Sequence, residues 1–364
     1  MRSLSIFALM TISKVLLATP FTQTNLVSDI NGLALTTDPH LVDPWGMSFS
    51  ATSPIWVSDR ATGLSTLYSG AGAIVSLVVT IPPGAPAGPT GQVFAGGTNF
   101  MLNGNPANFI FDTLAGTIDA WNGTTTATIV ATTVGATYEG LALANNTLYA
   151  ANFEAGGGIN AFNSSYAPIT TAGGFTDPNL PGGYAPFNIQ DIGGNLYVEY
   201  AKVAASQPVP LPGGGGYVDV FDTNGHLLQR LISNGPLDAP WGVALAPATF
   251  GGFGGDLLVG NFGNGEINAF NPTTGAFLGT ITDGGGNPIV NSGLWALDFG
   301  NSAANPNALY FTAGLNQGAD GLFGEIQATP EPTSLSITAL GLLGVLGYGW
   351  KRFNSNAAQP SDRS

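Results

Sequence analysis

Four oxygen-bearing side chains in this sequence could together bind a metal ion. They are Glu139, Asn188, Asn261 and Asp298, which lie far apart along the chain. Carboxylate and amide oxygens are the ligands that calcium prefers in proteins. The four side chains can converge only if the chain folds into repeated units and several units each supply one ligand. The sequence between them therefore decides whether a calcium site can form.

Other catalytic groups are scarce. The chain contains no cysteine, which excludes disulfide bonds, thiolate catalysis and cysteine-bound metals. Its two histidines are His40, in a predicted connecting loop, and His226, directly after a predicted hairpin turn. Because neither is expected on a strand that would line a central site, a Ser-His-Asp arrangement is poorly supported.

The charge distribution restricts the partners of the chain. Lysine and arginine total 8 against 22 aspartate and glutamate, and the net charge is −14. Between the terminal segments the only cations are Arg60, Lys202 and Arg230. Nucleic acid binding requires many cations to neutralise phosphates, so this class of partner is excluded.

A repeated pattern occupies residues 21–328, with a period of roughly 45 to 55 residues, which is typical of propellers and solenoids. Each copy has an apolar strand that ends in a polar residue, a glycine-containing turn and a second strand. The strand-ending residues are Asp59, Asp112, Asn152, Glu199 and Asn261. Such residues usually cap turns through the backbone, and a ring of ligand-binding groups is the alternative.

Each unit also has a strand before and a strand after this pair. Six units of four antiparallel strands predict an all-β, six-bladed β-propeller. The sixth unit supplies only three strands before residue 328, so residues 21–27 are expected to add the fourth strand and close the ring.

Aromatic residues open several of the predicted inner strands. Trp45, Trp241 and Trp295 should therefore surround the central channel. Aromatic rings at a channel mouth could stack on the apolar faces of sugars, and the alternative is packing between blades. The propeller also places Glu139, Asn188, Asn261 and Asp298 in different blades, which keeps the calcium site open.

Both chain ends carry processing signals. Residues 1–20 resemble a secretory signal peptide, with cleavage expected between about residues 18 and 22. Near the other end, Pro330, Glu331 and Pro332 precede an uncharged apolar run, residues 333–350, of the minimum length for a transmembrane helix. The basic pair at 351–352 should stay cytoplasmic.

Two resemblances follow from these residues. The motif Pro330-Glu331-Pro332, the apolar run and the basic pair resemble the PEP-CTERM sorting signal of bacteria, which implies processing by an exosortase-type protease. The repeats resemble NHL-type propellers, and the whole chain resembles exported bacterial propellers of uncharacterised function. Some six-bladed propellers with lactonase or esterase activity hold calcium in the channel, and this likeness implies the calcium-site hypothesis above.

Together these features predict four segments: a signal peptide (1–20), a β-propeller (21–328), a sorting signal with a transmembrane helix (329–352) and a cytoplasmic tail (353–364). We expect an exported protein that is first anchored in the membrane and then reaches the cell surface or extracellular matrix. A non-catalytic scaffold without cofactor, binding polysaccharide or envelope components, is favoured over an enzyme. The alternative is a calcium-dependent hydrolase or lactonase.

Overall fold

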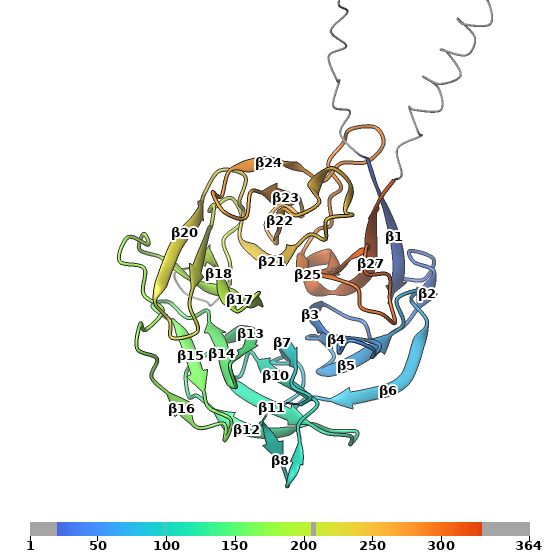
Figure 1. The fold of residues 1–364 in the computed structure, drawn as a ribbon. Helices are drawn as coiled ribbons and strands as arrows, with labels where there is room; N and C mark the ends of the chain where they lie inside the picture. The colour runs from blue at the N-terminus through green and yellow to red at the C-terminus, as the bar shows by residue number, and fades with distance from the viewer. Residues whose placement is uncertain (1–19, 98, 205–208, 330–364) are drawn as a thin grey trace, which may run out of the picture. The chain divides into compact units, whose positions relative to one another are not determined.

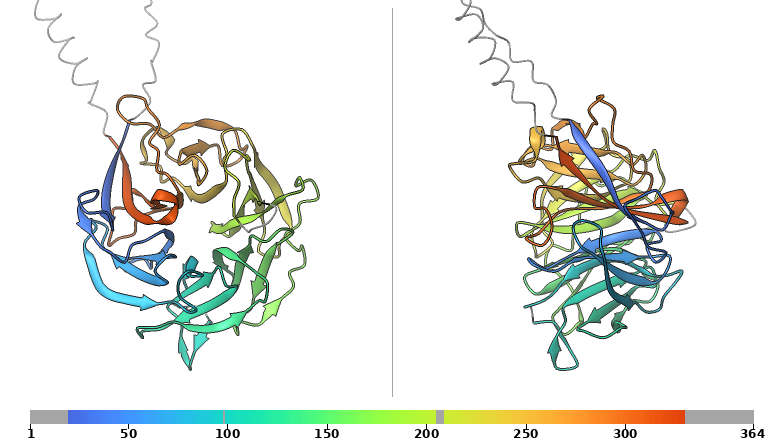
Figure 2. Two further views of the ribbon diagram at one scale, coloured as in Figure 1. Left: turned by 180° about the vertical axis from the view of Figure 1, so that it is seen from behind. Right: turned by 90° about the vertical axis from the view of Figure 1, so that its right-hand side faces the viewer.

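The repeats predicted from the sequence fold as small antiparallel sheets arranged in a ring. The computed structural model describes residues 20–97, 99–204 and 209–329. Figure 1 shows six sheets around a common centre, and Figure 2 shows the same ring from behind and from the side. Each sheet has its first strand nearest the centre, which confirms the predicted six-bladed β-propeller.

The first three blades use consecutive strands of the chain. Blade one is β3 (Pro44–Ser48), β4 (Ile55–Asp59), β5 (Leu64–Tyr68) and β6 (Ile74–Thr80). Blade two is β7 (Pro89–Phe94), β10 (Phe109–Thr113), β11 (Thr117–Trp121) and β12 (Thr128–Thr132), with a small hairpin of β8 (Met101–Leu102) and β9 (Asn105–Pro106) inserted. Blade three is β13 (Tyr138–Ala144), β14 (Thr147–Asn152), β15 (Ile159–Phe162) and β16 (Pro168–Ile169).

The remaining blades complete the ring. Blade four is β17 (Tyr184–Ile192), β18 (Asn195–Lys202), β19 (Tyr217–Phe221) and β20 (Leu227–Ser233). Blade five is β21 (Pro240–Leu245), β22 (Leu257–Asn261), β23 (Ile267–Phe270) and β24 (Phe277–Thr280), with a 3-10 turn at Gly251–Phe253. Blade six contains β25 (Leu294–Phe299), β26 (Leu309–Gly314) and β27 (Asp320–Ala328), with the short helix α1 (Leu315–Gly318) before its last strand.

The amino-terminal strand closes the ring. β1 (Phe21–Ser28) pairs antiparallel with β27, from Phe21 opposite Ala328 to Ser28 opposite Leu322. It therefore supplies the outer strand of blade six, as the sequence predicted. A short strand that was not predicted, β2 (Thr36–Thr37), adds to β1 in parallel. Joining the two ends of the repeat region in one sheet leaves no unpaired outer edge on β27.

The strand-ending polar residues do not form one ring. Asp59, Asn152 and Asn261 each pair with the first residue of the facing inner-strand segment. Asp112 and Glu199 each lie one residue before the equivalent position, because Thr113 pairs with Pro89 and Tyr200 pairs with Pro186, the third residue of β17. Neighbouring residues on a strand point to opposite faces, so the five side chains divide between two environments.

Glycines on the inner strands allow neighbouring blades to approach closely. A Cβ atom on Gly46 would lie 2.4 Å from the Thr90 oxygen of the next blade, and one on Gly91 would lie 2.3 Å from the Leu141 nitrogen. A Cβ atom on Gly140 or Gly242 would likewise overlap atoms of the following blade. Any side chain here would therefore force two blades apart.

Blades four and six lack this glycine and are joined to the next blade by side-chain hydrogen bonds. In blade four the position is Asn188, whose Nδ2 donates to the Trp241 carbonyl oxygen at 2.7 Å. In blade six it is Ala296, and the neighbouring Thr312 Oγ1 donates to the Trp45 carbonyl oxygen at 2.5 Å. Both bonds reach the inner strand of the next blade, so side-chain amides and hydroxyls replace direct backbone contact there.

Several carboxyl groups are buried between the blades. Asp59, Asp112, Asp119, Glu199 and Asp219 are each fully buried. Asp112 Oδ1 accepts hydrogen bonds from Thr90 Oγ1 at 2.8 Å and from the Gly91 amide at 2.6 Å. Burial nevertheless raises the pKa of Asp112 from 3.8 to about 7, because it disfavours the charged form.

The predicted signal peptide, Pro330, Glu331 and Pro332 of the sorting motif, and the apolar run 333–350 lie outside the described residues, apart from Pro20 at the end of the signal peptide. Within residues 20–97, 99–204 and 209–329, no helix is both long enough and apolar enough to cross a membrane. The predicted transmembrane helix therefore stays a prediction from the sequence.

Gly91→Ala should destabilise the propeller by about 1–3 kcal/mol, because the new methyl group would overlap the inner strand of blade three. Urea unfolding of residues 20–329 measures this change. Gly182→Ala is the control, since a Cβ there meets no atom within 4 Å. Equal stability of the two variants would contradict the close approach of the inner strands.

The pKa of Asp112 predicts how stability changes with pH. The folded chain keeps this proton at pH values where the unfolded chain has released it, so stability should fall as pH rises from about 4 to about 7. Asp112→Asn removes the titrating carboxyl group. The substitution should therefore reduce the slope of the unfolding free energy against pH by up to about 1.4 kcal/mol per pH unit. Urea unfolding at pH 5, 6 and 7 tests this.

The control for this measurement is Asp283→Asn. Asp283 is partly exposed, and hydrogen bonds from the Asn287 amides lower its pKa, so the substitution should leave the slope above pH 5 unchanged. A wild-type slope in Asp112→Asn would show that the buried carboxyl releases its proton in the ordinary acidic range.

Candidate functional site

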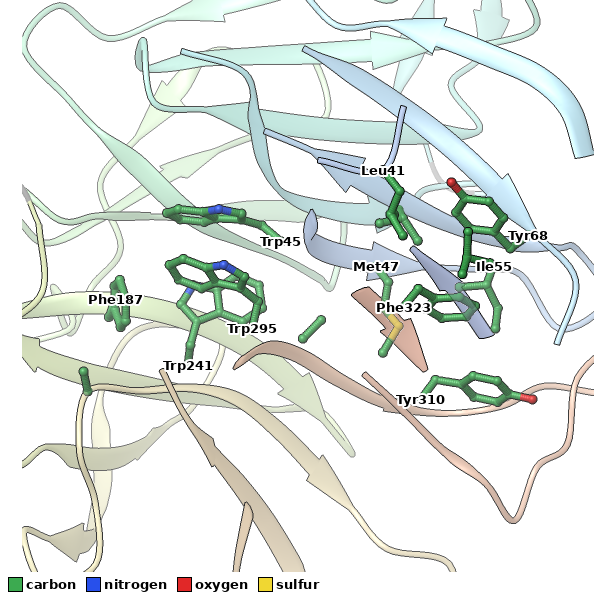
Figure 3. Close-up of a cluster of buried hydrophobic side chains, with 14 of the residues drawn as sticks. Leu41, Trp45, Met47, Ile55, Tyr68, Phe187, Trp241, Trp295, Tyr310 and Phe323 are labelled. Carbon is green, nitrogen blue, oxygen red and sulfur yellow. The ribbon is translucent and has the colours of Figure 1, made fainter. Parts of the chain in front are cut away.

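One end of the central channel is filled by aromatic side chains. Trp295 stacks on Trp45 with ring centroids 3.5 Å apart, and it meets Trp241 edge-on at 5.7 Å. Phe262 and Phe187 also contact Trp295, at 4.4 and 5.7 Å. Figure 3 shows the three tryptophans and Phe187 gathered in one cluster. We call these five residues the aromatic cluster.

The three tryptophans are therefore not exposed on a ligand face. Trp45, Trp241 and Trp295 are each at most 6% exposed. Of the two alternatives considered from the sequence, the burial of the tryptophans agrees with packing between blades, because the inner strands of the neighbouring blades five, six and one direct these large side chains at one another. In this structure their apolar surface is satisfied by packing rather than left open for a sugar.

Hydrogen bonds hold two tryptophans of the aromatic cluster in place. Trp241 Nε1 donates to the Glu139 carbonyl oxygen at 3.0 Å. Trp45 Nε1 donates to Asp43 Oδ2 at 2.9 Å, and Arg60 Nε donates to the same oxygen at 2.5 Å. Burial raises the pKa of Asp43, and the Arg60 charge opposes that rise. This end of the channel is thus a fixed structural element.

The middle of the channel is narrow. The inner-strand glycines described above bring the blades together here and leave a cavity of about 20 Å³. Gln92, Asn188, Gln190 and Trp241 are among the residues that line it. A space of this size holds about one water molecule, so it separates the two ends of the channel for anything larger.

The other end of the channel opens into a larger cavity of about 270 Å³. We call it the mouth cavity. It is lined by the carboxy-terminal halves of the inner strands of five blades and by Phe49, which directly follows β3. The lining residues are Met47, Ser48, Phe49, Gln92, Val93, Phe94, Leu141, Ala142, Leu143, Gln190, Asp191 and Asp298. The cavity thus combines apolar walls with two amides and two carboxyl groups.

Asp298 is the most perturbed polar group in the mouth cavity. Its Oδ1 accepts a hydrogen bond from the Phe299 amide at 2.8 Å. The surrounding apolar side chains raise the pKa of Asp298 from 3.8 to about 7. Asp191 lies at the exposed rim, where its Oδ1 accepts from the Gly194 amide at 2.9 Å, and partial burial raises its pKa as well.

The four predicted calcium ligands occupy different surroundings. Asp298 lines the mouth cavity and Asn188 the narrow one, while Glu139 is buried beside the aromatic cluster. Asn261 Nδ2 donates to the Pro236 carbonyl oxygen at 2.8 Å, in a loop of blade five. In the described part of the chain, no three His, Asp or Glu side chains are grouped as a metal site would require. The calcium site stays a prediction.

Sequence reasoning missed most of the mouth cavity. Gln92, Gln190 and Asp191 line it, and their signal in the sequence is weak. Gln92 directly follows Gly91, and Gln190 and Asp191 follow Asn188 by two and three positions, where Gly91 and Asn188 are the residues that face the next blade. Several other inner strands carry apolar residues there, such as Leu141 and Leu143.

Comparisons with known proteins give relatives without assigned function. No protein-family model matches the chain. "Uncharacterized protein R648" of Acanthamoeba polyphaga mimivirus is 31% identical over 83% of this chain and 78% of its own length. "Uncharacterized protein L690" of the same virus is 32% identical over 83% of this chain and 84% of its own length. Neither is bacterial, so the bacterial part of the resemblance has no support here.

Solved structures resemble the chain in fold alone. A streptogramin B lyase has a TM-score of 0.51 at 13% identity, over 85% of this chain and 97% of that one. The soluble aldose sugar dehydrogenase of Escherichia coli has a TM-score of 0.51 at 11% identity, over 85% of this chain and all of that one. Such low identities carry no activity across. The extent of the sequence match to the two viral proteins shows that this chain belongs to the same family as they do.

Proposed function

We propose that this protein is a non-catalytic propeller that binds a saccharide, or a saccharide-bearing envelope component, in the mouth cavity. The observation that carries the proposal is the contrast between the two channel ends. The aromatic cluster fills one, and the other holds a cavity of about 270 Å³.

The lining of the mouth cavity suits sugar chemistry. Sugars have apolar faces and polar edges, so they need apolar walls beside hydrogen-bonding groups. Phe49, Phe94 and Leu141 supply apolar surface, and Gln190 and Asp298 supply polar groups beside it. Binding sites for small molecules usually combine apolar lining with a few polar side chains in this way.

A calcium-dependent hydrolase or lactonase is the second candidate. Asp298, with a pKa of about 7, could exchange a proton with a substrate near neutral pH, as a general acid or base must. His40 and His226 pair instead with Asp38 and Asp222, and neither histidine lines the mouth cavity. We favour the binding function because the four predicted calcium ligands lie in separate surroundings.

The proposal includes export and surface display. It is supported by the order of the signal-like segment 1–20, the motif Pro330-Glu331-Pro332, the apolar run 333–350 and the basic pair that follows. The chain would be anchored through its apolar run and then released to the surface or matrix by an exosortase-type protease.

Gln190→Ala should weaken saccharide binding by about 2- to 12-fold, because it removes hydrogen bonds worth roughly 0.5–1.5 kcal/mol. Isothermal titration of residues 20–329 with neutral oligosaccharides measures the affinity. Gln229→Ala is the control, since Gln229 lies on the outer strand β20 and donates to the Thr273 carbonyl oxygen. Failure of every saccharide to bind, or equal effects of the two variants, would refute binding in the mouth cavity.

Glu331→Ala should keep the chain membrane-bound in a host with an exosortase-type protease, because the motif is the proposed recognition sequence. Cell fractionation followed by mass spectrometry of the released carboxy terminus tests this. Glu325→Ala, a substitution on β27 just before the motif, should be released normally. Normal processing of Glu331→Ala would remove the sorting signal from the account.

A further inference from the structure

We infer that the mouth cavity selects saccharides that carry an amino group and rejects those that carry carboxylate or sulfate, with Asp298 contacting the ligand's ammonium. This inference rests on the proposed binding function and adds the chemical class of the ligand.

The charged groups that line the mouth cavity are all acidic. Asp191 and Asp298 line it, and no lysine or arginine does. Two of the three cations in residues 20–97, 99–204 and 209–329 are paired elsewhere, Arg60 with Asp43 and Arg230 with Asp177. An anionic sugar entering the cavity would thus meet like charge in a partly desolvated space and gain no compensating cation.

Asp298 has bonding capacity left for a ligand. The one hydrogen bond to its carboxylate in the described structure comes from the Phe299 amide, and none of the ion pairs among the described residues includes it. When ionised it is an uncompensated carboxylate lining an open cavity. A ligand ammonium would supply both the missing opposite charge and a hydrogen-bond donor, and charge-assisted hydrogen bonds of this kind are about twice as strong as neutral ones.

Gln92 has a buried acceptor without a partner beside the two cavities. Its Nε2 donates to the Gly46 and Trp56 carbonyl oxygens, which fixes the orientation of the amide. Its Oε1 is buried and has no hydrogen-bond partner among the described residues. Gln92 lines both the narrow cavity and the mouth cavity, and the group that completes its bonding, a water or a ligand, must be a donor. Ammonium and hydroxyl groups are donors, whereas carboxylate and sulfate groups are not.

The test compares three oligosaccharides of equal length on the full-length protein at pH 7. They are an oligomer of glucosamine, one of N-acetylglucosamine and one of glucuronate, each titrated by calorimetry. The amino oligomer should bind about tenfold more tightly than the neutral one, and the acidic one should bind weakest. Equal affinities for all three would overturn the inference and leave the binding function standing, whereas no binding by any would remove both.

Two variants assign the preference to Asp298. Asp298→Asn should remove the preference for the amino over the neutral oligomer. Asp256→Asn, a substitution outside the cavity lining, should leave the preference for the amino oligomer unchanged. If Asp298→Asn does not fold, Gln190→Glu adds a carboxyl to the same cavity and should increase the preference. An unchanged preference in the variant that folds would contradict the role of the carboxyl.

Discussion

The close approach of the inner strands at the channel axis determines most of this structure. Gly46, Gly91, Gly140 and Gly242 place the backbone of one blade against that of the next, at distances that exclude a side chain. Where a blade lacks this glycine, Asn188 or Thr312 bridges to the next inner strand by a hydrogen bond. The ring is thus narrowest in its middle, and its two ends can differ.

Those two ends have different roles because different residues of the same strands reach them. The aromatic cluster joins inner strands of blades one, four, five and six through stacked, tilted and edge-on ring contacts, so that end contributes packing energy. At the other end, polar and apolar side chains leave the mouth cavity open. One set of strands therefore supplies both a rigid core and a site whose lining can vary without loss of the fold.

The sequence predicted the fold in detail because the repeat, the turn glycines and the missing outer strand are local or periodic signals. β1 closing blade six on β27 is the clearest case. The environments of the side chains were harder to predict from the sequence. Asp112 and Glu199 differ from Asp59 by one residue in strand register, which places their side chains on the other face of the strand. Which end of the channel each inner-strand residue reaches depends on packing around the ring, so the sequence left open whether the tryptophans pack between blades or face a ligand.

The central claim is that ligands enter the mouth cavity and not another surface. Methionine-methyl NMR of residues 20–329 tests it directly, because this segment contains only Met47, which lines the mouth cavity, and Met101, which is 46% exposed on β8. Titration with an oligosaccharide that binds the protein should shift the Met47 methyl signal and leave the Met101 methyl signal unchanged. A shift of Met101 alone, or no shift of Met47 at saturation, would contradict the account.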